Sequence, residues 1–195
     1  MAMALKYAEL TPLWELMHCT VQAGRILQRA AETQNSSGLL REIEDLRWQA
    51  SAWVQECTIK IQNTFITAID AKVMLYLIYY LYRLLRDLLC TARFLLSEQQ
   101  IDSTDLNRYL RWVCSYTEKV VLRSERSFWA VSRNKSQRLS TVFDTSEGES
   151  LSLGAFRYLS GKEDFRQAAI LAMLRQCENT AYDIDVFTLQ HSIYE

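Results

Sequence analysis

Glycine and proline are scarce in this chain, and their scarcity is the strongest constraint on what it can fold into. Only five glycines and one proline occur in 195 residues. Sandwiches and barrels of β-strands need many tight turns, and these two residues supply most of them. Apolar residues make up 49% of the chain and charged residues 23%, as in a globular domain and unlike a disordered one. We therefore expect a mostly helical globular fold.

Two helices are expected in the first third of the chain. Thr11 and Pro12 are typical of an N-cap and a first helical position, so a first helix is predicted from there to about residue 34. A second helix is predicted over 39–63. Its apolar residues recur every three or four positions: Leu39, Ile43, Leu46, Ala50, Trp53, Cys57 and Ile61. Charged residues occupy the opposite side, so this helix is expected to bury one face.

A third helix, predicted over 68–96, is apolar on nearly every side. Its run of ten apolar and aromatic residues, 73–82, is followed by Arg83, Arg86 and Asp87. A membrane span needs about 20 apolar residues with few charges, so this run is interpreted as buried core. We expect this helix to be central in the fold, because its exposure would leave a large apolar patch in water.

The last part of the chain gives weaker signals. A fourth helix is predicted from near Asp105, and its periodicity fades after Arg126, so it either breaks there or continues toward residue 142. Residues 144–150 have the composition of a loop, and a shorter helix is predicted over 161–177. Residues 182–189 alternate apolar and acidic side chains, which is typical of a strand, with a helix as the alternative.

These predictions combine into an all-α fold. It is a bundle of four long, mostly antiparallel helices with a smaller C-terminal helix and an irregular or strand-like tail. The chain is expected to be a single domain, with the main bundle in 1–143, a loop in 144–150 and the C-terminal helix and tail in 151–195.

Cysteine usage and the N-terminal residues favour a cytoplasmic location. The five cysteines are odd in number, widely spaced and without a Cys-x-x-Cys pair, which is unlike a secreted disulfide framework. The first ten residues have neither the apolar core nor the basic start of a signal peptide. We therefore expect a soluble protein with reduced thiols and no integral membrane span.

Motifs for catalysis are missing, so no catalytic, cofactor-binding or metal-binding residue is assigned. His18 and His191 are the only histidines, and neither belongs to a metal-ligand motif or to a nucleophile–base–orienter pattern. Glycine-rich phosphate loops are also missing. The prediction is a protein that is not an enzyme and has no cofactor.

Basic and aromatic residues are interleaved between residues 108 and 138. Eight Lys and Arg stand there against two Glu. Cations neutralise phosphates and flat rings stack on bases, so Arg123, Arg126, Trp129 and Arg133 are candidate nucleic-acid contacts. The alternative is a solvated helix face that acidic loops balance.

A line of polar residues crosses the apolar third helix. It contains Tyr76, Tyr79, Arg83, Arg86 and Arg93, which together could form a groove for a partner or an anion. The alternative is that this line faces water or meets carboxylates from neighbouring helices.

The leading functional hypothesis is a non-enzymatic interaction protein, a self-associating adaptor or regulator that acts as a homodimer. It depends on the many aromatic residues, with five Trp, ten Tyr and seven Phe, and on helices with more than one apolar face. Trp48 and Trp53, for example, lie on different sides of the second helix. The alternative is a nucleic-acid-binding protein, with RNA as the first ligand to test, that uses the basic helix around 108–138.

Overall fold

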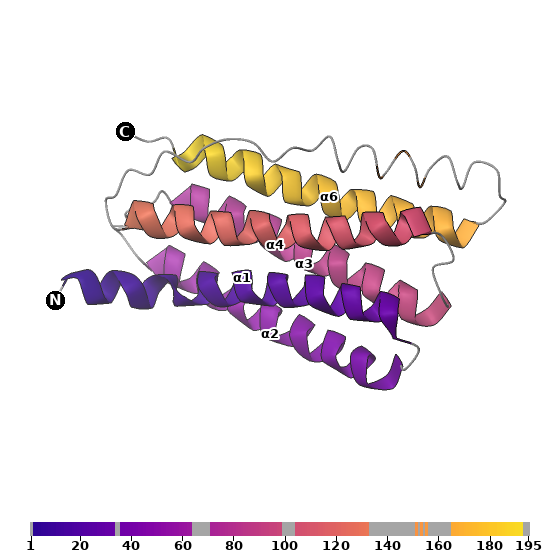
Figure 1. The fold of residues 1–195 in the computed structure, drawn as a ribbon. Coiled ribbons are helices and arrows are strands. Elements are labelled where there is room, and N and C mark those ends of the chain that lie inside the picture. The colour runs from indigo at the N-terminus through magenta and orange to yellow at the C-terminus, as the bar shows by residue number, and fades with distance from the viewer. Residues whose placement is uncertain are drawn as a thin grey trace.

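The computed structural model is helical along the parts of the chain that it describes, which are residues 2–33, 36–63, 71–98, 104–132, 151, 153, 155 and 165–192. Its long helices are α1 (Ala2–Glu32), α2 (Ser36–Asn63), α3 (Ala71–Glu98), α4 (Thr104–Ser132) and α6 (Phe165–Ser192) (Figure 1). Side chains are described for 10–33, 37–63, 71–97, 104–128 and 165–191 of these helices. No strand occurs in these ranges, and the predicted all-α bundle is confirmed.

Four helices close into a ring, and a fifth lies outside it. Around the ring α1 packs against α3, α3 against α6, α6 against α4, and α4 against α1. The outer helix, α2, packs only against α1 and α3 within the described ranges. The C-terminal helix was expected to be a smaller addition to a bundle of the first four. Instead α6 has 28 residues, as many as α2 and α3, and it completes the ring.

Side-chain contacts give the direction of each neighbour. The pairs Glu44–Arg93 and Ser51–Tyr82 make α2 and α3 antiparallel. In the same way α1 is antiparallel to α2 and to α4, and α3 is antiparallel to α6. In contrast, α4 and α6 lie side by side and run parallel (Figure 1). α1 and α3 also pack together and run parallel, because both are antiparallel to α2. The prediction of mostly antiparallel helices is therefore confirmed for four of the six packed pairs of described helices, with α4–α6 and α1–α3 as exceptions.

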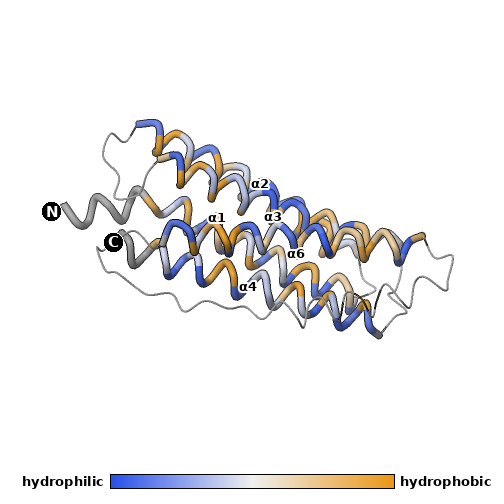
Figure 2. Tube along the Cα trace, turned by 90° about the horizontal axis from the view of Figure 1, so that it is seen from above, coloured by the Kyte–Doolittle hydropathy of each residue, from blue (hydrophilic) through white to orange (hydrophobic). Residues whose placement is uncertain are grey.

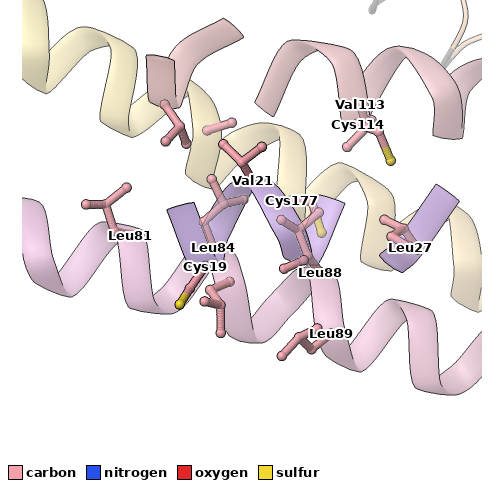
Figure 3. Packing of buried hydrophobic residues seen from close by; sticks show 14 of the residues in the cluster. Cys19, Val21, Leu27, Leu81, Leu84, Leu88, Leu89, Val113, Cys114 and Cys177 are labelled. Carbon is pink, nitrogen blue, oxygen red and sulfur yellow. The ribbon is translucent and has the colours of Figure 1, made fainter. Parts of the chain in front are cut away.

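The apolar core fills the centre of the ring. Leu84 and Leu88 of α3, Val21 of α1, Cys114 of α4 and Cys177 of α6 belong to one cluster of buried residues (Figure 3). Hydrophobic and hydrophilic positions are mixed along every helix in Figure 2, and most of the buried side chains are apolar. The run 73–82 contributes Met74, Leu77, Ile78 and Leu81 to the core. Leu75, Tyr76 and Tyr79 are exposed, so the run is buried on one side only and its interpretation as buried core is only partly right.

The start of α1 differs from the prediction. The helix begins at Ala2 and passes through Pro12, which is buried and not the first helical residue. Proline removes one backbone hydrogen bond and crowds the preceding turn, but the helix on either side keeps its other bonds. A Thr-Pro pair therefore marks a possible helix start without requiring one.

The strand-like interpretation of 182–189 is wrong, because these residues belong to α6. Ile184 and Asp185 are both buried although they are adjacent, since α6 packs against α3 on one side and α4 on the other. Thr180 and Thr188 are buried as well. Because several buried positions of α6 are polar, its apolar residues do not recur at helical spacing. The sequence of 182–189 therefore shows only an alternation of apolar and acidic residues.

The other boundaries agree with prediction where the structure describes them. The second and third helices lie within about three residues of their expected limits. The fourth continues past Phe128 to Ser132. The predicted loop 144–150 and the expected start of the last helix at residue 161 lie outside the described residues.

Candidate functional site

Polar side chains are buried where α4 meets α6. Arg123 Nη1 and Asp185 Oδ1 lie 3.0 Å apart, and their side chains are only 12% and 8% exposed. Ser124 and Thr188 share a hydrogen bond of 2.7 Å between their hydroxyl oxygens. Nearer the start of both helices, the Tyr109 hydroxyl donates to Glu178. These contacts determine how the two parallel helices align.

A second polar cluster lies where α3 meets α6. Thr180 Oγ1 donates to Asp87 Oδ2 at 3.5 Å, and Thr91 Oγ1 lies 3.8 Å from Cys177 Sγ. Burial raises the pKa of the Asp87 carboxyl, and the nearby Arg86 and Arg83 only partly oppose this effect. Burial likewise raises the pKa of Asp185 against the opposing effect of Arg123. Both carboxyls belong to the packing of α6.

The thiols and imidazoles are not arranged for nucleophilic chemistry. All five cysteines are free, and Cys90 is the exposed one. Burial raises the pKa of Cys57 and Cys114 to about 12, which leaves them protonated at neutral pH. His191 stacks on Phe187, and its Nδ1 lies 2.9 Å from the Phe187 carbonyl oxygen. Within the described ranges, no three His, Cys, Asp or Glu side chains are grouped closely enough to hold a metal ion.

A small hollow of about 350 Å³ lies between the end of α1 and the start of α4. Its walls include Glu32, Asn107, Arg108 and Arg111. The Arg111 guanidinium lies 3.7 Å from Glu32, and that of Arg108 lies 3.8 Å from Asp105. Ligand sites are mostly apolar with a few convergent polar groups, and this hollow has paired charges instead.

The structure separates the candidate nucleic-acid contacts. Arg123 is held in the buried ion pair with Asp185, whereas Arg126, on the same helix, is exposed. The backbone of Trp129 belongs to α4, but its side chain and all of Arg133 lie outside the described residues. Arg108 and Arg111 each face a carboxylate. Four of the described cations, Arg108, Arg111, Lys119 and Arg126, are nevertheless exposed within about 80° of one another around α4, while Arg123 is paired inside the bundle.

The polar line on the third helix lies on the outer side of α3. We call it the α3 ridge, and its members are Lys72, Leu75, Tyr76, Tyr79, Arg83, Arg86, Cys90 and Arg93. Tyr79 is 58% exposed and Tyr76 is 48% exposed. Arg93 Nη1 lies 3.0 Å from Glu44 Oε1 on α2, and Arg83 Nε lies 4.0 Å from Asp87. The ridge faces water along its length and touches carboxylates at two points.

Aromatic rings extend the ridge toward α6. The rings of Tyr76 and Tyr80 lie 6.3 and 5.8 Å from that of Phe187, measured between centroids. Tyr79 meets Tyr80 edge to face at 5.6 Å, and Lys72 Nζ lies 6.0 Å from the Tyr76 centroid. The sequence did not indicate that Phe187 contacts these tyrosines, because the contact depends on how α6 packs against α3.

A second exposed apolar surface lies on α2. We call it the α2 stripe, which consists of Trp48, Ala52, Gln55 and Ile59. Trp48 is 76% exposed and Ile59 is 48% exposed. Trp53, in contrast, packs against the core, so the prediction that the two tryptophans lie on different sides is confirmed. Ile59 was not predicted to be part of a surface, although its spacing from Trp48 places both residues on the same side of a helix.

None of the helices that the structure describes contains a stretch long and apolar enough to cross a membrane. The sequence matches no protein family, and no curated protein matches it.

Proposed function

We propose that this protein is a non-enzymatic interaction protein that self-associates through the α2 stripe. The observation that carries the proposal is Trp48, a large aromatic side chain that is 76% exposed on the outermost helix. Tryptophan is among the residues that most often anchor protein interfaces. The five free cysteines support a cytoplasmic setting for this role.

The stripe has the geometry of a helix–helix contact. At about 100° per residue, its four positions fall within about 60° of one another around α2. They point away from the buried face that contains Ile43, Leu46, Ala50 and Cys57. Ala52 at the middle of the stripe has only a methyl group, which allows a second helix to approach closely.

The spacings between the four stripe residues are four, three and four, so they are the same when counted from either end. Two antiparallel copies of α2 would therefore place each Trp48 opposite Ile59 of the other copy, with Ala52 opposite Gln55. A two-fold dimer requires this self-complementarity, because the same surface serves both subunits. The stripe thus favours a second copy of this chain as its occupant.

The expected dimer is reversible. Burying one Trp side chain removes about 200 Å² from water, which contributes about 5 kcal/mol per copy. Association itself costs about 4–15 kcal/mol in lost motion. The contributions of two copies of Trp48 and Ile59 are comparable with this cost, so the dimer should dissociate on dilution.

Light scattering after size exclusion tests the proposal. At about 50 µM the wild type should have a mass above that of one chain. Trp48→Ser should return it to the monomer, whereas Gln49→Glu, an exposed change about 100° around the helix, should not. In Trp48→Lys/Ile59→Glu, each lysine would face a glutamate of the other copy, so the double variant should dimerise better than either single variant. A monomeric wild type, or a dimer that Trp48→Ser leaves intact, would refute the proposal.

The alternative of nucleic-acid binding has less support. Among the described cations of 108–128, Arg108, Arg111 and Arg123 each lie within 4.0 Å of a carboxylate. Arg126 and Lys119 are exposed, and they are the residues to change in a direct test.

A further inference from the structure

The α3 ridge has an uneven composition that the α2 stripe does not share. It carries the cations Lys72, Arg83, Arg86 and Arg93 and no carboxylate, although the chain as a whole has a net charge of -1. In a protein with nearly balanced charge, four cations along one exposed side of one helix form a local positive field. Such a field selects partners of negative charge.

The positive charge of the ridge is only partly compensated. Glu44 approaches Arg93 from α2, and Asp87 lies at the edge of the ridge, 4.0 Å from Arg83. Arg86 is exposed and forms no ion pair within 4.0 Å among the described residues, although it lies near enough to Asp87 to lower the pKa of that carboxyl. Surface ion pairs such as Arg93–Glu44 are weak, so an incoming carboxylate can compete for these guanidinium groups.

The other half of the ridge is aromatic and aliphatic. Leu75 is 40% exposed, and Tyr76 and Tyr79 are about half exposed. Contacts with Tyr80 and Phe187 hold these two rings in place, so little conformational freedom would be lost when a partner covers them. The ridge therefore has an apolar end near Leu75 and a cationic end near Arg93.

We propose that the α3 ridge binds an acidic amphipathic helix of a partner protein. The partner would place apolar side chains against Leu75, Tyr76 and Tyr79 and carboxylates against Arg83, Arg86 and Arg93. From Tyr76 onward the ridge residues are spaced by three or four positions, which is also the spacing of one face of a partner helix. From Tyr76 to Arg93 the ridge is about 26 Å long, which matches a partner helix of about 17 residues.

Two other modes of recognition fit the ridge less well. An extended peptide binds by adding a strand to a sheet edge, and the described residues contain no sheet. A single-stranded nucleic acid could stack its bases on Tyr76 and Tyr79, but the aromatic half of the ridge has only Lys72 to neutralise its phosphates. A phosphate backbone also has no apolar group that would pack against Leu75. A protein helix with one apolar end and one acidic end is complementary to both halves.

A synthetic helix of 17 residues is the direct probe. It would have leucines on one face at one end, glutamates on the same face at the other end, alanines elsewhere and a fluorescein label. Fluorescence anisotropy should show binding at low salt that weakens as salt rises. A matched peptide with glutamine in place of each glutamate should bind at least about tenfold more weakly, because several charge pairs are lost.

Substitutions in the protein locate the site. Arg86→Glu/Arg93→Glu should weaken binding of the acidic peptide at least about tenfold, and the milder Arg86→Gln/Arg93→Gln should weaken it less. The matched control is Lys119→Glu/Arg126→Glu, which changes the net charge equally at exposed positions of α4. This control should bind as the wild type does. Circular dichroism verifies that each variant is folded.

Cys90 provides an independent readout, because it lies on the ridge between Arg86 and Arg93 and the other four thiols are buried. Bound peptide should slow the alkylation of Cys90 by N-ethylmaleimide. Equal binding of the glutamine peptide, unchanged binding by both ridge variants, or an unprotected Cys90 would overturn the proposal. Tighter binding of a single-stranded RNA to the same arginines would also overturn it, by assigning the ridge to nucleic acid.

The inference extends the interaction role proposed above but does not depend on the dimer. The variant Trp48→Ser removes the tryptophan of the α2 stripe without adding charge, and it should bind the acidic peptide as the wild type does. Arg86→Gln/Arg93→Gln should keep the mass of the wild type in light scattering. Failure of the peptide experiment and failure of the dimer experiment are therefore separate results.

Discussion

Helices α1 and α6 occupy opposite corners of the same ring, yet different contacts hold them there. The inner side of α1 is mostly apolar, with Leu13, Leu16, Met17 and Leu27 almost fully buried. Its buried Thr20 donates to the Leu16 carbonyl oxygen within the same helix and so needs no partner on another helix. Its ion pairs, such as Arg25–Glu118, lie on the outside, where both side chains are more than 40% exposed. The inner side of α6 combines Ile170 and Leu174 with the buried polar residues Thr180, Asp185 and Thr188.

The two kinds of contact have different effects. Apolar contacts stabilise the fold, whereas buried polar contacts determine which alignment of the helices forms. Apolar burial stabilises α1 without distinguishing one apolar neighbour from another. Buried polar groups add little net stability, because leaving water costs about as much as their contacts return. A misplaced α6 would leave Asp185 or Thr188 without its partner, which is costly. We infer that the polar contacts of α6 select its parallel alignment with α4.

A charge placed in the apolar half of the core should have the largest effect. Leu77 is fully buried, so Leu77→Asp would bring a carboxylate into the core with no cation to pair with it. The expected cost is several kcal/mol, a large part of the 5–15 kcal/mol that stabilises a typical domain. Thermal melting followed by circular dichroism measures it. Glu44→Lys, a change at a half-exposed residue, should cost about 1 kcal/mol or less. Wild-type melting of Leu77→Asp would contradict the central position of α3.

Breaking an ion pair should have a large effect in the α6 contact and a small one in the α1 contact. Arg123→Met leaves Asp185 buried without its cation and should cost about 3–5 kcal/mol in urea unfolding. Arg25→Met breaks the exposed pair with Glu118 and should cost about 1 kcal/mol or less. The double variant Arg123→Met/Asp185→Leu should recover most of the lost stability. Equal costs for the two single variants would remove the distinction between α1 and α6.

The smallest expected effect concerns pH, and it arises where Asp87 of α3 contacts Thr180 of α6. Burial raises the pKa of Asp87 above its ordinary value of 3.8, so the folded state binds this proton more tightly than the unfolded chain. The stability that the proton contributes is present below pH 3.8 and is lost as the pH rises through the raised value. Asp87→Asn cannot ionise, so it should melt above the wild type at neutral pH, by a margin that shrinks toward pH 4.

Melting curves between pH 4 and pH 7 measure this margin. Asp183→Asn, a change at an exposed carboxyl of α6, controls for the loss of one negative charge. If Asp87→Asn melts below the wild type at neutral pH, the carboxylate of Asp87 contributes hydrogen bonds that exceed its cost of burial.

The same contrast explains which parts of the fold could be predicted. The second helix was predicted almost to the residue, because Leu39, Ile43 and Leu46 show the helical period directly. In α6 the core-facing positions include Gln167, Thr180 and Asp185, so no apolar period marks that face. Phe165, the first residue of α6, is apolar and yet 85% exposed.

Exposed residues could likewise be predicted only where residues of one kind share one side of a helix. The sequence alone does not distinguish Arg123 from Arg126. In the structure, Arg123 is paired inside the bundle and Arg126 faces water. The line from Tyr76 to Arg93 could be recognised, because its residues share one side of a helix that is otherwise apolar. The α2 stripe was not recognised as a surface, since nothing local shows that α2 is the outermost helix.

Residue order alone determined that this chain is helical, that the run 73–82 supplies core residues and that the α3 ridge is one continuous face. These properties follow from glycine and proline content and from the helical period, which act over one or two turns of chain. Only the tertiary structure decided that α6 closes the ring, that α2 lies outside it and that Asp185 pairs with Arg123. These properties depend on contacts between residues far apart in the chain, and a buried polar residue is tolerated only where its partner arrives from another helix.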